Sequence, residues 1–332
     1  MTAMKAIGYR NYGLPEVLHV CELDKPIPRA DEILVEIHAA EATKADCELR
    51  SFQFAVKWFW LPLRLAMGIR RPRRPLLGGY FAGKVVQVGE QVERFQVGDE
   101  VFGSAGLRMG AYGEYACYPA SYSIAAKPTN LSFEQAAAVP LGAFNALHFM
   151  RKAKIQPGAR VLVNGAGGSI GSFAVQIAKG MGAEVTAVDI GIKEEMLRSI
   201  GADHFFDYTK EDFSSAGRTY DVVFDMVAGS SYSKCIGVLN SKGRYLMGNP
   251  RVSGMIRSLF TGWLTQKSVH FAFAGETLQE LLDLKQMLEA GEIRPLLDRV
   301  YPPSQAAQAH RRVEAEERLG IVVLNMRQFS TP

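Results

Sequence analysis

A glycine-rich turn between a short β-branched run and an apolar helical run constrains the fold of this chain more than any other stretch. Residues 161–164 have the composition of a buried strand, and residues 165–171 are Gly-Ala-Gly-Gly-Ser-Ile-Gly, followed by apolar residues at helical spacing. A tight turn of this kind aims the free N–H groups of a helix N-terminus at a phosphate. Ala166 stands where a strict G-x-G-x-x-G would have its first glycine, so packing alone is an alternative role for the turn. The candidate cofactor-binding residues here are Gly165, Gly167, Gly168, Ser169, Ile170 and Gly171.

An acidic residue follows at about the separation at which a dinucleotide-binding chain places its ribose ligand. Residues 184–189 have the pattern of a second strand, and Asp189 ends it. Its carboxylate would accept hydrogen bonds from a free ribose diol and repel a 2′-phosphate. Lys193 is close enough in sequence to soften that repulsion, so the pattern favours NAD(H), while NADP(H) is possible. The alternative role for Asp189 is that of a helix N-cap after the strand.

Length and composition exclude several classes of protein. With 332 residues the chain can form two domains with full cores, and its 22% charged and 48% hydrophobic residues are ordinary for a soluble globular protein. The net charge of +4 is too small to predict a nucleic-acid partner. The four cysteines have no C-x-x-C spacing, which fits a reducing compartment. No leader sequence and no stretch of membrane-spanning length is recognisable, so the sequence predicts a cytoplasmic protein.

The rest of the chain divides into a β-rich first half and an alternating second half. Strand patterns, separated by proline and glycine turns, occur at residues 4–9, 32–40, 77–89, 95–103 and 110–116. Beyond the glycine turn, strand patterns alternate with helical stretches at residues 204–208, 221–227, 243–248 and 269–274, which predicts a doubly wound parallel sheet. Ligands of such sheets lie beyond the carboxyl ends of the strands. This rule adds Val227, Gly248 and the backbone at Phe273 to the candidate cofactor contacts.

Several segments resemble the medium-chain dehydrogenase/reductase superfamily, and the likeness covers nearly the whole chain. It rests on the opening residues 12–18, the Val-Gly-Asp turn at 97–99, the run Ala-Ala-Ala-Val-Pro-Leu at 136–141 and the run Leu-Arg-Ser-Ile-Gly-Ala-Asp at 197–203. The resemblance implies an α/β protein with a GroES-like, β-rich catalytic domain and a Rossmann domain with a doubly wound parallel sheet, and it makes a homodimer the expected assembly. The implied domains are residues 1–127, residues 128–272, and residues 273–332, which complete the catalytic domain with a returning strand at 320–324.

The positions of the family's zinc ligands hold other residues in this chain. The zinc alcohol dehydrogenases have a cysteine where Thr43 stands, and a histidine and a glutamate where Gly79 and Tyr80 stand. Cys47 and Glu48 are displaced by about a helical turn and do not rebuild a tetrahedral site. The four-cysteine lobe of those enzymes is also missing from the sequence. The chain is therefore similar to the zinc-free quinone oxidoreductase branch, although that branch usually has an aspartate where Tyr80 stands.

The missing zinc ligands limit the substrates that we expect. Oxidation of a simple alcohol passes through an alkoxide, whose parent pKa is about 16, and a zinc ion normally stabilises that charge. Without the ion the substrate must accept electrons readily, as quinones and α,β-unsaturated carbonyls do, and hydrogen-bond donors then suffice. The sequence thus predicts zinc-independent transfer of hydride from NAD(P)H to a small hydrophobic quinone or enone. The alternatives are an enoyl-thioester or aldehyde/alcohol oxidoreductase, and a nucleotide-binding protein with little turnover.

Polar residues near the altered zinc positions are the candidate catalytic groups. They are Thr43, Asp46, Tyr80 and Tyr112. Lys44 is a further candidate donor, and Arg50 is placed to orient the donors. Each has a plainer alternative, since Asp46 and Arg50 have the i,i+4 spacing of a local ion pair and Tyr112 could belong to a half-buried strand.

One polar residue in the following helical stretch is a candidate cofactor contact. Asn145 stands where the family has a threonine that approaches the nicotinamide. Its alternative role is a helix-start cap after Pro140. Both interpretations stay open at the level of the sequence.

Two apolar insertions are not explained by the cofactor motifs. Residues 52–69 are rich in Phe, Trp and Leu and are followed by the basic run at 70–74, and residues 256–264 form a second apolar segment. Together they could wall a hydrophobic substrate site, with a subunit contact as the alternative. For residues 52–69 a third interpretation is a basic amphipathic element on an anionic membrane. Pro62 interrupts any long helix and no regular polar face emerges, so we rank that interpretation last.

Overall fold

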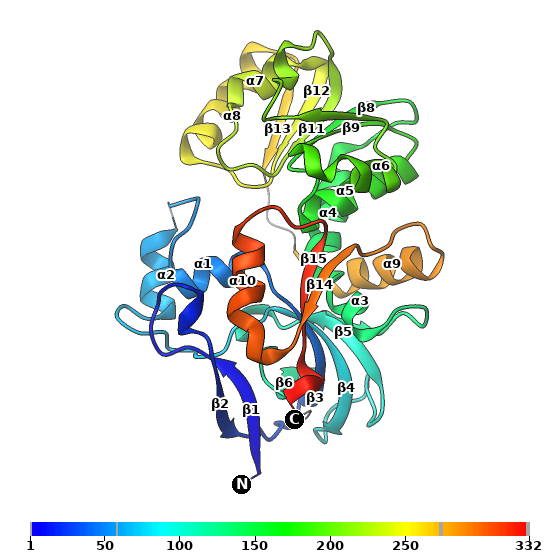
Figure 1. Cartoon of the computed structure of the whole chain (residues 1–332). Helices are drawn as coiled ribbons and strands as arrows, with labels where there is room; N and C mark the ends of the chain where they lie inside the picture. The colour runs from blue at the N-terminus through cyan, green and yellow to red at the C-terminus, as the bar shows by residue number, and fades with distance from the viewer. Residues whose placement is uncertain (1, 58, 272–274, 330–332) are drawn as a thin grey trace.

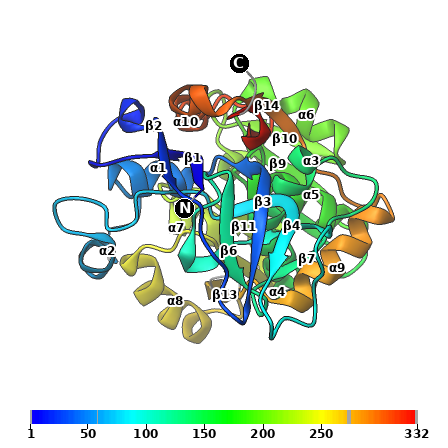
Figure 2. The same cartoon turned by 90° about the horizontal axis from the view of Figure 1, so that it is seen from below.

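The computed structural model describes residues 2–57, 59–271 and 275–329 and confirms the predicted mixed α/β class. The described strands form three sheets, of which two are large. Figure 1 shows these two sheets in two domains, with the parallel sheet in the upper domain and the GroES-like sheet in the lower one. Figure 2 looks onto the lower sheet from below, where β3 (Glu32–Glu41) runs between β4 (Tyr80–Val88) and β6 (Tyr115–Pro119).

Strand β3 organises the sheet of the lower domain. One of its edges pairs with β4, and the other edge is shared by β6 and β15 (Ile321–Asn325), all antiparallel. The pairing of β15 with β3 confirms the prediction that a strand near 320–324 returns to the first domain. The remaining strands are β5 (Glu100–Ser104), β7 (Ile124–Ala126) and β14 (Leu297–Tyr301), while β1 (Ala3–Gly8) and β2 (His19–Asp24) form a separate ribbon.

Parallel strands in the order β10-β9-β8-β11-β12-β13 form the upper sheet. The chain enters at β8 in the interior and builds outward in both directions, which is the predicted doubly wound order. One strand is longer than predicted, since β12 starts at Leu239 rather than at residue 243 and pairs there with Tyr220. The strands are β8 (Arg160–Asn164), β9 (Glu184–Asp189), β10 (His204–Asp207), β11 (Tyr220–Asp225), β12 (Leu239–Met247) and β13 (Ser268–Phe271).

Helices cover the upper sheet on both faces, with α5 and α6 on one side and α7 and α8 on the other (Figure 1). A glycine lets two of them approach closely, because a Cβ on Gly142 would lie 2.5 Å from the carbonyl oxygen of Ser169. This contact joins the helix that enters the upper domain to the helix after the glycine turn. The helices are α4 (Pro140–Ala153), α5 (Ser169–Gly180), α6 (Glu194–Ser199), α7 (Tyr232–Gly237) and α8 (Val252–Leu264).

Local signals in the sequence account for where the helices of the lower domain begin. Capping boxes start α3 and α9, with Ser132 bonded to Gln135 and Thr277 bonded to Glu280. Pro62 lies in the first turn of α2, where its missing N–H has no intrahelical partner to lose. These helices are α1 (Lys44–Ser51), α2 (Trp60–Met67), α3 (Phe133–Ala137), α9 (Leu278–Glu289) and α10 (Ala306–Glu314). Within the described ranges, every helix is too short or too polar to cross a bilayer.

Candidate active site

The glycine turn joins β8 to α5 with a geometry that larger residues would not allow. Gly165 has a positive φ of 82°, which favours glycine. A Cβ on Gly171 would lie 2.6 Å from the Cα of Ala166, so this glycine lets α5 start against the turn. Since α5 begins at Ser169, its first N–H groups have no intrahelical acceptor. The turn therefore has the form of an anion-binding helix N-terminus.

The acid at the end of β9 is tied to this turn. Asp189 accepts a hydrogen bond from the backbone N–H of Gly167 at 2.7 Å, and Ile190 N–H donates to its other oxygen at 2.9 Å. The Nζ of Lys193 lies 2.9 Å from Asp189 Oδ1, and both side chains are buried. Asp189 is thus not a helix N-cap, because the short helix that follows starts after Ile190. Its carboxylate oxygens have further lone pairs that could accept from a ribose.

One of the residues predicted beyond the strand ends lines a small cavity. Val227 follows β11 and is 43% exposed, and it lines a cavity of about 200 Å³ together with Met247. Gly248 follows β12, and its backbone N–H donates to the carbonyl of Asp225 at 2.8 Å. Phe273 lies outside the described residues. Contacts of these positions with a cofactor stay predictions.

Asn145 lies well inside α4 rather than at its start. The helix begins at Pro140, and Asn145 donates from Nδ2 to the carbonyl of Leu141 at 2.9 Å. The alternative role as a helix-start cap is therefore wrong, since that position belongs to Val139. Asn145 is half-buried, and its contact with a nicotinamide stays a prediction.

Thr43 and Asp46 bind each other in a capping box at the start of α1. The Oγ1 of Thr43 donates to Asp46 Oδ2 at 2.6 Å and accepts from the Asp46 backbone N–H at 2.9 Å. Gly78 N–H donates to the second oxygen of Asp46 at 3.0 Å. Both side chains are buried, and burial raises the pKa of Asp46. The Thr43–Asp46 pair caps the start of α1, and its polar atoms already have hydrogen-bond partners within the protein.

The alternative role of Asp46 and Arg50 as a local ion pair is wrong. Arg50 is almost fully buried, and it forms its ion pair with Glu314 of α10. The reason is that Asp46 turns toward the helix N-terminus, where its charge stabilises the first turn. Lys44, the further candidate donor, forms an ion pair with Glu316.

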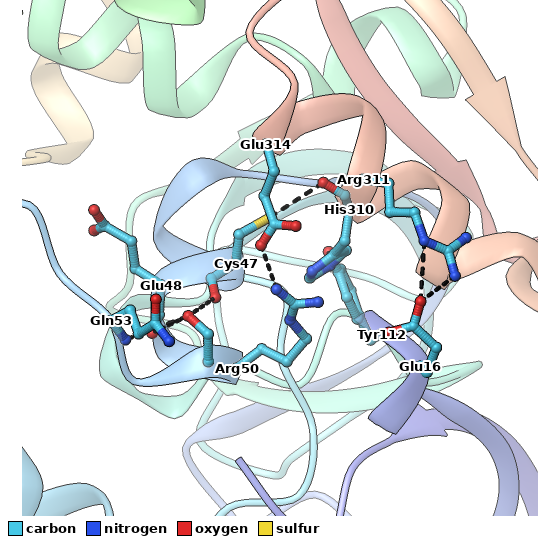
Figure 3. Close-up of polar contacts among 10 residues, drawn as sticks. Glu16, Cys47, Glu48, Arg50, Gln53, Tyr112, His310, Arg311 and Glu314 are labelled. Atoms are coloured by element: carbon cyan, nitrogen blue, oxygen red, sulfur yellow. Dashed lines mark hydrogen bonds and ion pairs between the residues drawn. The ribbon is translucent and has the colours of Figure 1, made fainter. Parts of the chain in front are cut away.

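Tyr112 lies in the same core region as Arg50, between α1 and α10 (Figure 3). Its hydroxyl is 2.9 Å from Nε2 of His310, and both residues are fully buried. Burial lowers the pKa of His310 to about 3, helped by the charge of Arg50, and burial raises the pKa of Tyr112 well above its ordinary value. The structure therefore does not bring Tyr112 to an accessible surface.

Tyr80, by contrast, binds a segment that arrives from the upper domain. It is half-buried at the start of β4, and its hydroxyl donates to Glu276 Oε1 at 2.6 Å. The Oγ of Ser104 donates to the other carboxylate oxygen at 2.7 Å. Burial and the charge of Glu276 raise the pKa of Tyr80 well above 10. We call Tyr80, Ser104 and Glu276 the junction triad, since they lie where the chain passes between the domains.

A second carboxyl group connects the two domains. Glu41, at the end of β3, accepts a hydrogen bond at 3.0 Å from the Oγ of Ser169, the first residue of α5. Its side chain is fully buried, and within the described part of the chain its Oε2 has no hydrogen-bond partner. Burial raises the pKa of Glu41 to about 8, against a smaller opposing effect of Arg318. Glu41 is therefore largely protonated at neutral pH.

The sequence alone had not nominated Glu41, Ser104 or Glu276. Glu41 could have been nominated, because it is a charged residue at the end of a strand that is almost entirely buried, and a buried charge needs a reason. Glu276 could not have been, since its partner Tyr80 is 196 residues away. Across the described ranges there is no group of three or more His, Cys, Asp or Glu placed to hold a metal ion.

Comparisons with known proteins agree with this architecture. Residues 29–129 match the alcohol dehydrogenase GroES-like domain, residues 200–324 a zinc-binding dehydrogenase family, and residues 134–228 the C-terminal domain of alanine dehydrogenase/PNT. The 2-methylene-furan-3-one reductase of Solanum lycopersicum is 32% identical over 97% of this chain and 79% of its own length. A quinone oxidoreductase of Sus scrofa is 30% identical over 93% of this chain and 94% of its own. The solved quinone oxidoreductase from Coxiella burnetii superposes with a TM-score of 0.87 at 26% identity, over 98% of this chain and all of that one.

Proposed function

This chain belongs to the medium-chain dehydrogenase/reductase superfamily of NAD(P)H-dependent oxidoreductases, and on that premise we propose that it reduces quinones or α,β-unsaturated carbonyls. The observation that carries the proposal is the junction triad. Where the zinc enzymes place a glutamate ligand, this chain has the phenol of Tyr80, bound to Glu276 and Ser104. A phenol can stabilise negative charge on a substrate oxygen by hydrogen bonding.

The glycine turn fits a dinucleotide. The N–H groups at the start of α5 would hold the pyrophosphate, and Asp189 with Lys193 would receive the adenosine ribose. When bound, the reduced nicotinamide supplies a hydride. Because Lys193 neutralises Asp189, the pair opposes a 2′-phosphate less than a lone carboxylate would.

Residues of the protein would stabilise the negative charge that hydride addition leaves on the substrate and would supply the proton that accompanies it. Tyr80 is a neutral phenol at pH 7, because its pKa is raised well above 10. A substrate oxygen would compete with Glu276 for the phenolic proton. Glu41 is also protonated at neutral pH, and its hydrogen bond to Ser169 places it beside the cofactor turn. We infer that Tyr80 donates a hydrogen bond to the substrate oxygen and that the protonated carboxyl group of Glu41 is a nearby source of a proton.

The proposal is tested by oxidation of NADH and NADPH against a panel of quinones, enals, enones, enoyl thioesters, aldehydes and simple alcohols. Turnover concentrated on quinones and enones is the expected result. Turnover with simple alcohols alone, together with bound zinc in elemental analysis, would overturn it. Tight binding of NADH without turnover would favour a nucleotide-binding protein.

The coenzyme preference is tested by a pair of opposite substitutions. Asp189→Ser removes the carboxylate and leaves Lys193 to attract a 2′-phosphate, so the NADPH-to-NADH ratio of kcat/KM should rise by about tenfold. Lys193→Met leaves Asp189 unneutralised and should lower the same ratio. Fluorescence titration with both coenzymes measures binding directly. An unchanged ratio in both variants would show that this pair does not contact the ribose.

A further inference from the structure

Nearly half of the exposed large hydrophobic side chains in the described part of the chain lie on two helices and the turn after one of them. They belong to α2 with Ile69, and to α8. Leu259 is 74% exposed and Trp263 is 82% exposed. The set is Trp60, Leu61, Leu65, Ile69, Val252, Ile256, Leu259, Phe260, Trp263 and Leu264. We call these residues, with the basic residues beside them, the α2–α8 face.

The apolar stripe of α8 points away from the protein. Ile256, Leu259, Phe260 and Trp263 recur at the spacing that puts them on one side of a helix, and all four are exposed. In α8 the buried positions are Gly254 and Thr261, whose hydroxyl lies 2.6 Å from that of Tyr232. A surface helix ordinarily turns its apolar side to the core. The inverted orientation indicates that something outside the chain covers the stripe.

The two helices lie on the same flank of the molecule. Figures 1 and 2 both show α2 and α8 on that side, in the lower and upper domain respectively. Their segments meet at a cavity of about 510 Å³, lined by Ala55, Val56 and Lys57 before α2 and by Arg251 and Val252 at the start of α8. The exposed apolar residues therefore lie on one side of the molecule, in one set on each domain with this cavity between them.

Both segments that carry this face are basic. Residues 52–75 contain six Lys or Arg and no acid, and residues 249–267 contain three Lys or Arg and no acid. Most of these cations are exposed. The guanidinium of Arg64 instead lies 4.2 Å from the ring centre of Tyr12 and 4.3 Å from that of Phe52, and so fixes α2 to the lower domain. The exposed basic residues are Lys57, Arg70, Arg71, Arg73, Arg74, Arg251 and Arg257.

The sequence alone ranks a membrane-binding role for residues 52–69 last, but the structure adds the exposed apolar side of α8 on the same flank, and we propose that the α2–α8 face docks on an anionic lipid bilayer. Exposed Leu, Phe and Trp side chains enter the boundary between headgroups and acyl chains, and the surrounding Lys and Arg attract anionic headgroups. A second copy of the chain suits the surface less well, because a twofold contact would set these like charges against each other. The proposal goes beyond the reductase function and does not depend on it.

Intrinsic fluorescence can report docking directly, because the three tryptophans of the chain, at positions 58, 60 and 263, all belong to these two segments. The protein is mixed with phosphatidylcholine vesicles with or without about 30 mol % phosphatidylserine, and binding is measured by flotation. We expect a blue-shifted emission and flotation with the anionic vesicles. Raising the salt from about 0.05 M to about 0.5 M should release the protein.

Two sets of variants separate the apolar and the electrostatic contributions. Leu259→Gln with Trp263→Gln should abolish flotation. Arg70→Gln, Arg71→Gln and Arg73→Gln together should weaken partitioning by about fivefold for each charge removed. Ile27→Gln is the matched control for the apolar set, since Ile27 is 76% exposed elsewhere on the surface. The matched control for the charges is Arg218→Gln with Arg299→Gln and Arg327→Gln, which are exposed on other elements.

Circular dichroism confirms that each variant is folded before binding is compared. Equal flotation of wild type and both variant sets would overturn the proposal, as would binding that ignores lipid charge. A wild-type chain that fails to float, but whose oligomers dissociate in the Leu259→Gln, Trp263→Gln variant on analytical ultracentrifugation, would overturn it in favour of a second copy.

Discussion

Two tyrosines in this protein have similar hydrogen-bond chemistry and opposite surroundings. The hydroxyl of Tyr112 lies against His310 in a fully buried core beneath α10. The hydroxyl of Tyr80, which is half-buried, binds Glu276 of the junction triad. Both are candidate catalytic residues from the sequence, and the family resemblance favours Tyr80 by its position. The comparison teaches that burial and the origin of the hydrogen-bond partner, rather than residue type, distinguish the two tyrosines.

The titratable groups near each tyrosine extend this contrast. Burial moves both Glu41 and His310 toward their neutral forms, since it raises the pKa of Glu41 to about 8 and lowers that of His310 to about 3. Glu41 lies at the domain junction and His310 in the core. Glu41 therefore lowers the free energy of unfolding at high pH, and His310 lowers it at low pH. The two effects can be tested separately.

The largest expected effect is on the pH dependence of stability through Glu41. Its pKa rises from 4.5 in the unfolded chain to about 8 in the folded one, so its contribution is fully present below pH 4.5 and is lost as the pH rises toward 8. At about 1.4 kcal/mol per pKa unit, wild type should lose a few kcal/mol relative to Glu41→Gln over that window. Urea denaturation from pH 5 to 8.5 measures the difference. If the free energy of unfolding changed with pH in the same way for both proteins, the prediction would be wrong.

His310 should produce the mirror effect in acid. Its pKa falls from 6.5 unfolded to about 3 folded, so the unfolded chain takes up a proton first and stability is lost as the pH falls below 6.5. Wild type should lose a few kcal/mol relative to His310→Gln between pH 6.5 and 4, at about 1.4 kcal/mol per pKa unit. The same urea series checks it. A constant difference between the two proteins across that range would show that His310 titrates normally.

Tyr80→Phe should separate activity from stability. Loss of a donor to the substrate oxygen should lower kcat by about a hundredfold. The free energy of unfolding should change by about 1 kcal/mol or less, because Glu276 keeps its bond to Ser104. Steady-state kinetics with a reducible quinone, beside denaturation curves, measures both. Full activity in this variant would remove Tyr80 from the proposed mechanism.

Tyr112→Phe is the matched variant and has the smallest expected effect. Nε2 of His310 would lose its partner in a buried place, which should cost about 1 kcal/mol of unfolding free energy. Because Tyr112 is fully buried, kcat should stay at the wild-type value. If Tyr112→Phe lowered kcat as far as Tyr80→Phe, the distinction between the two tyrosines would fail.

The sequence predicts well those features that short segments determine. The glycine turn and the strand that ends at Asp189 depend on residues close in the chain, and the structure has both of these elements in place. The parallel order of the upper sheet follows from the alternation of strands and helices. These features could be predicted because the interactions that form them are local.

The candidate site is harder to predict because its contacts are long-range. Arg50 has an acid at i−4 but pairs with Glu314, since Asp46 is engaged by Thr43 and Gly78. Glu276 reaches Tyr80 only because the chain crosses between the domains. The outward orientation of the apolar side of α8 also depends on packing, which the spacing of its residues does not reveal. Tertiary contacts decided all three outcomes.

The position of β15 between β14 and β3 has a consequence for synthesis on the ribosome. The strands of the upper sheet emerge as one uninterrupted stretch, from residue 160 to residue 271, and can assemble as soon as they are made. The end of β3, made much earlier, must wait for residues 321–325 to cover its edge. A nascent chain stalled after β13 would therefore carry a folded nucleotide-binding half beside an open sheet edge, which is the kind of surface that chaperones and proteases act on.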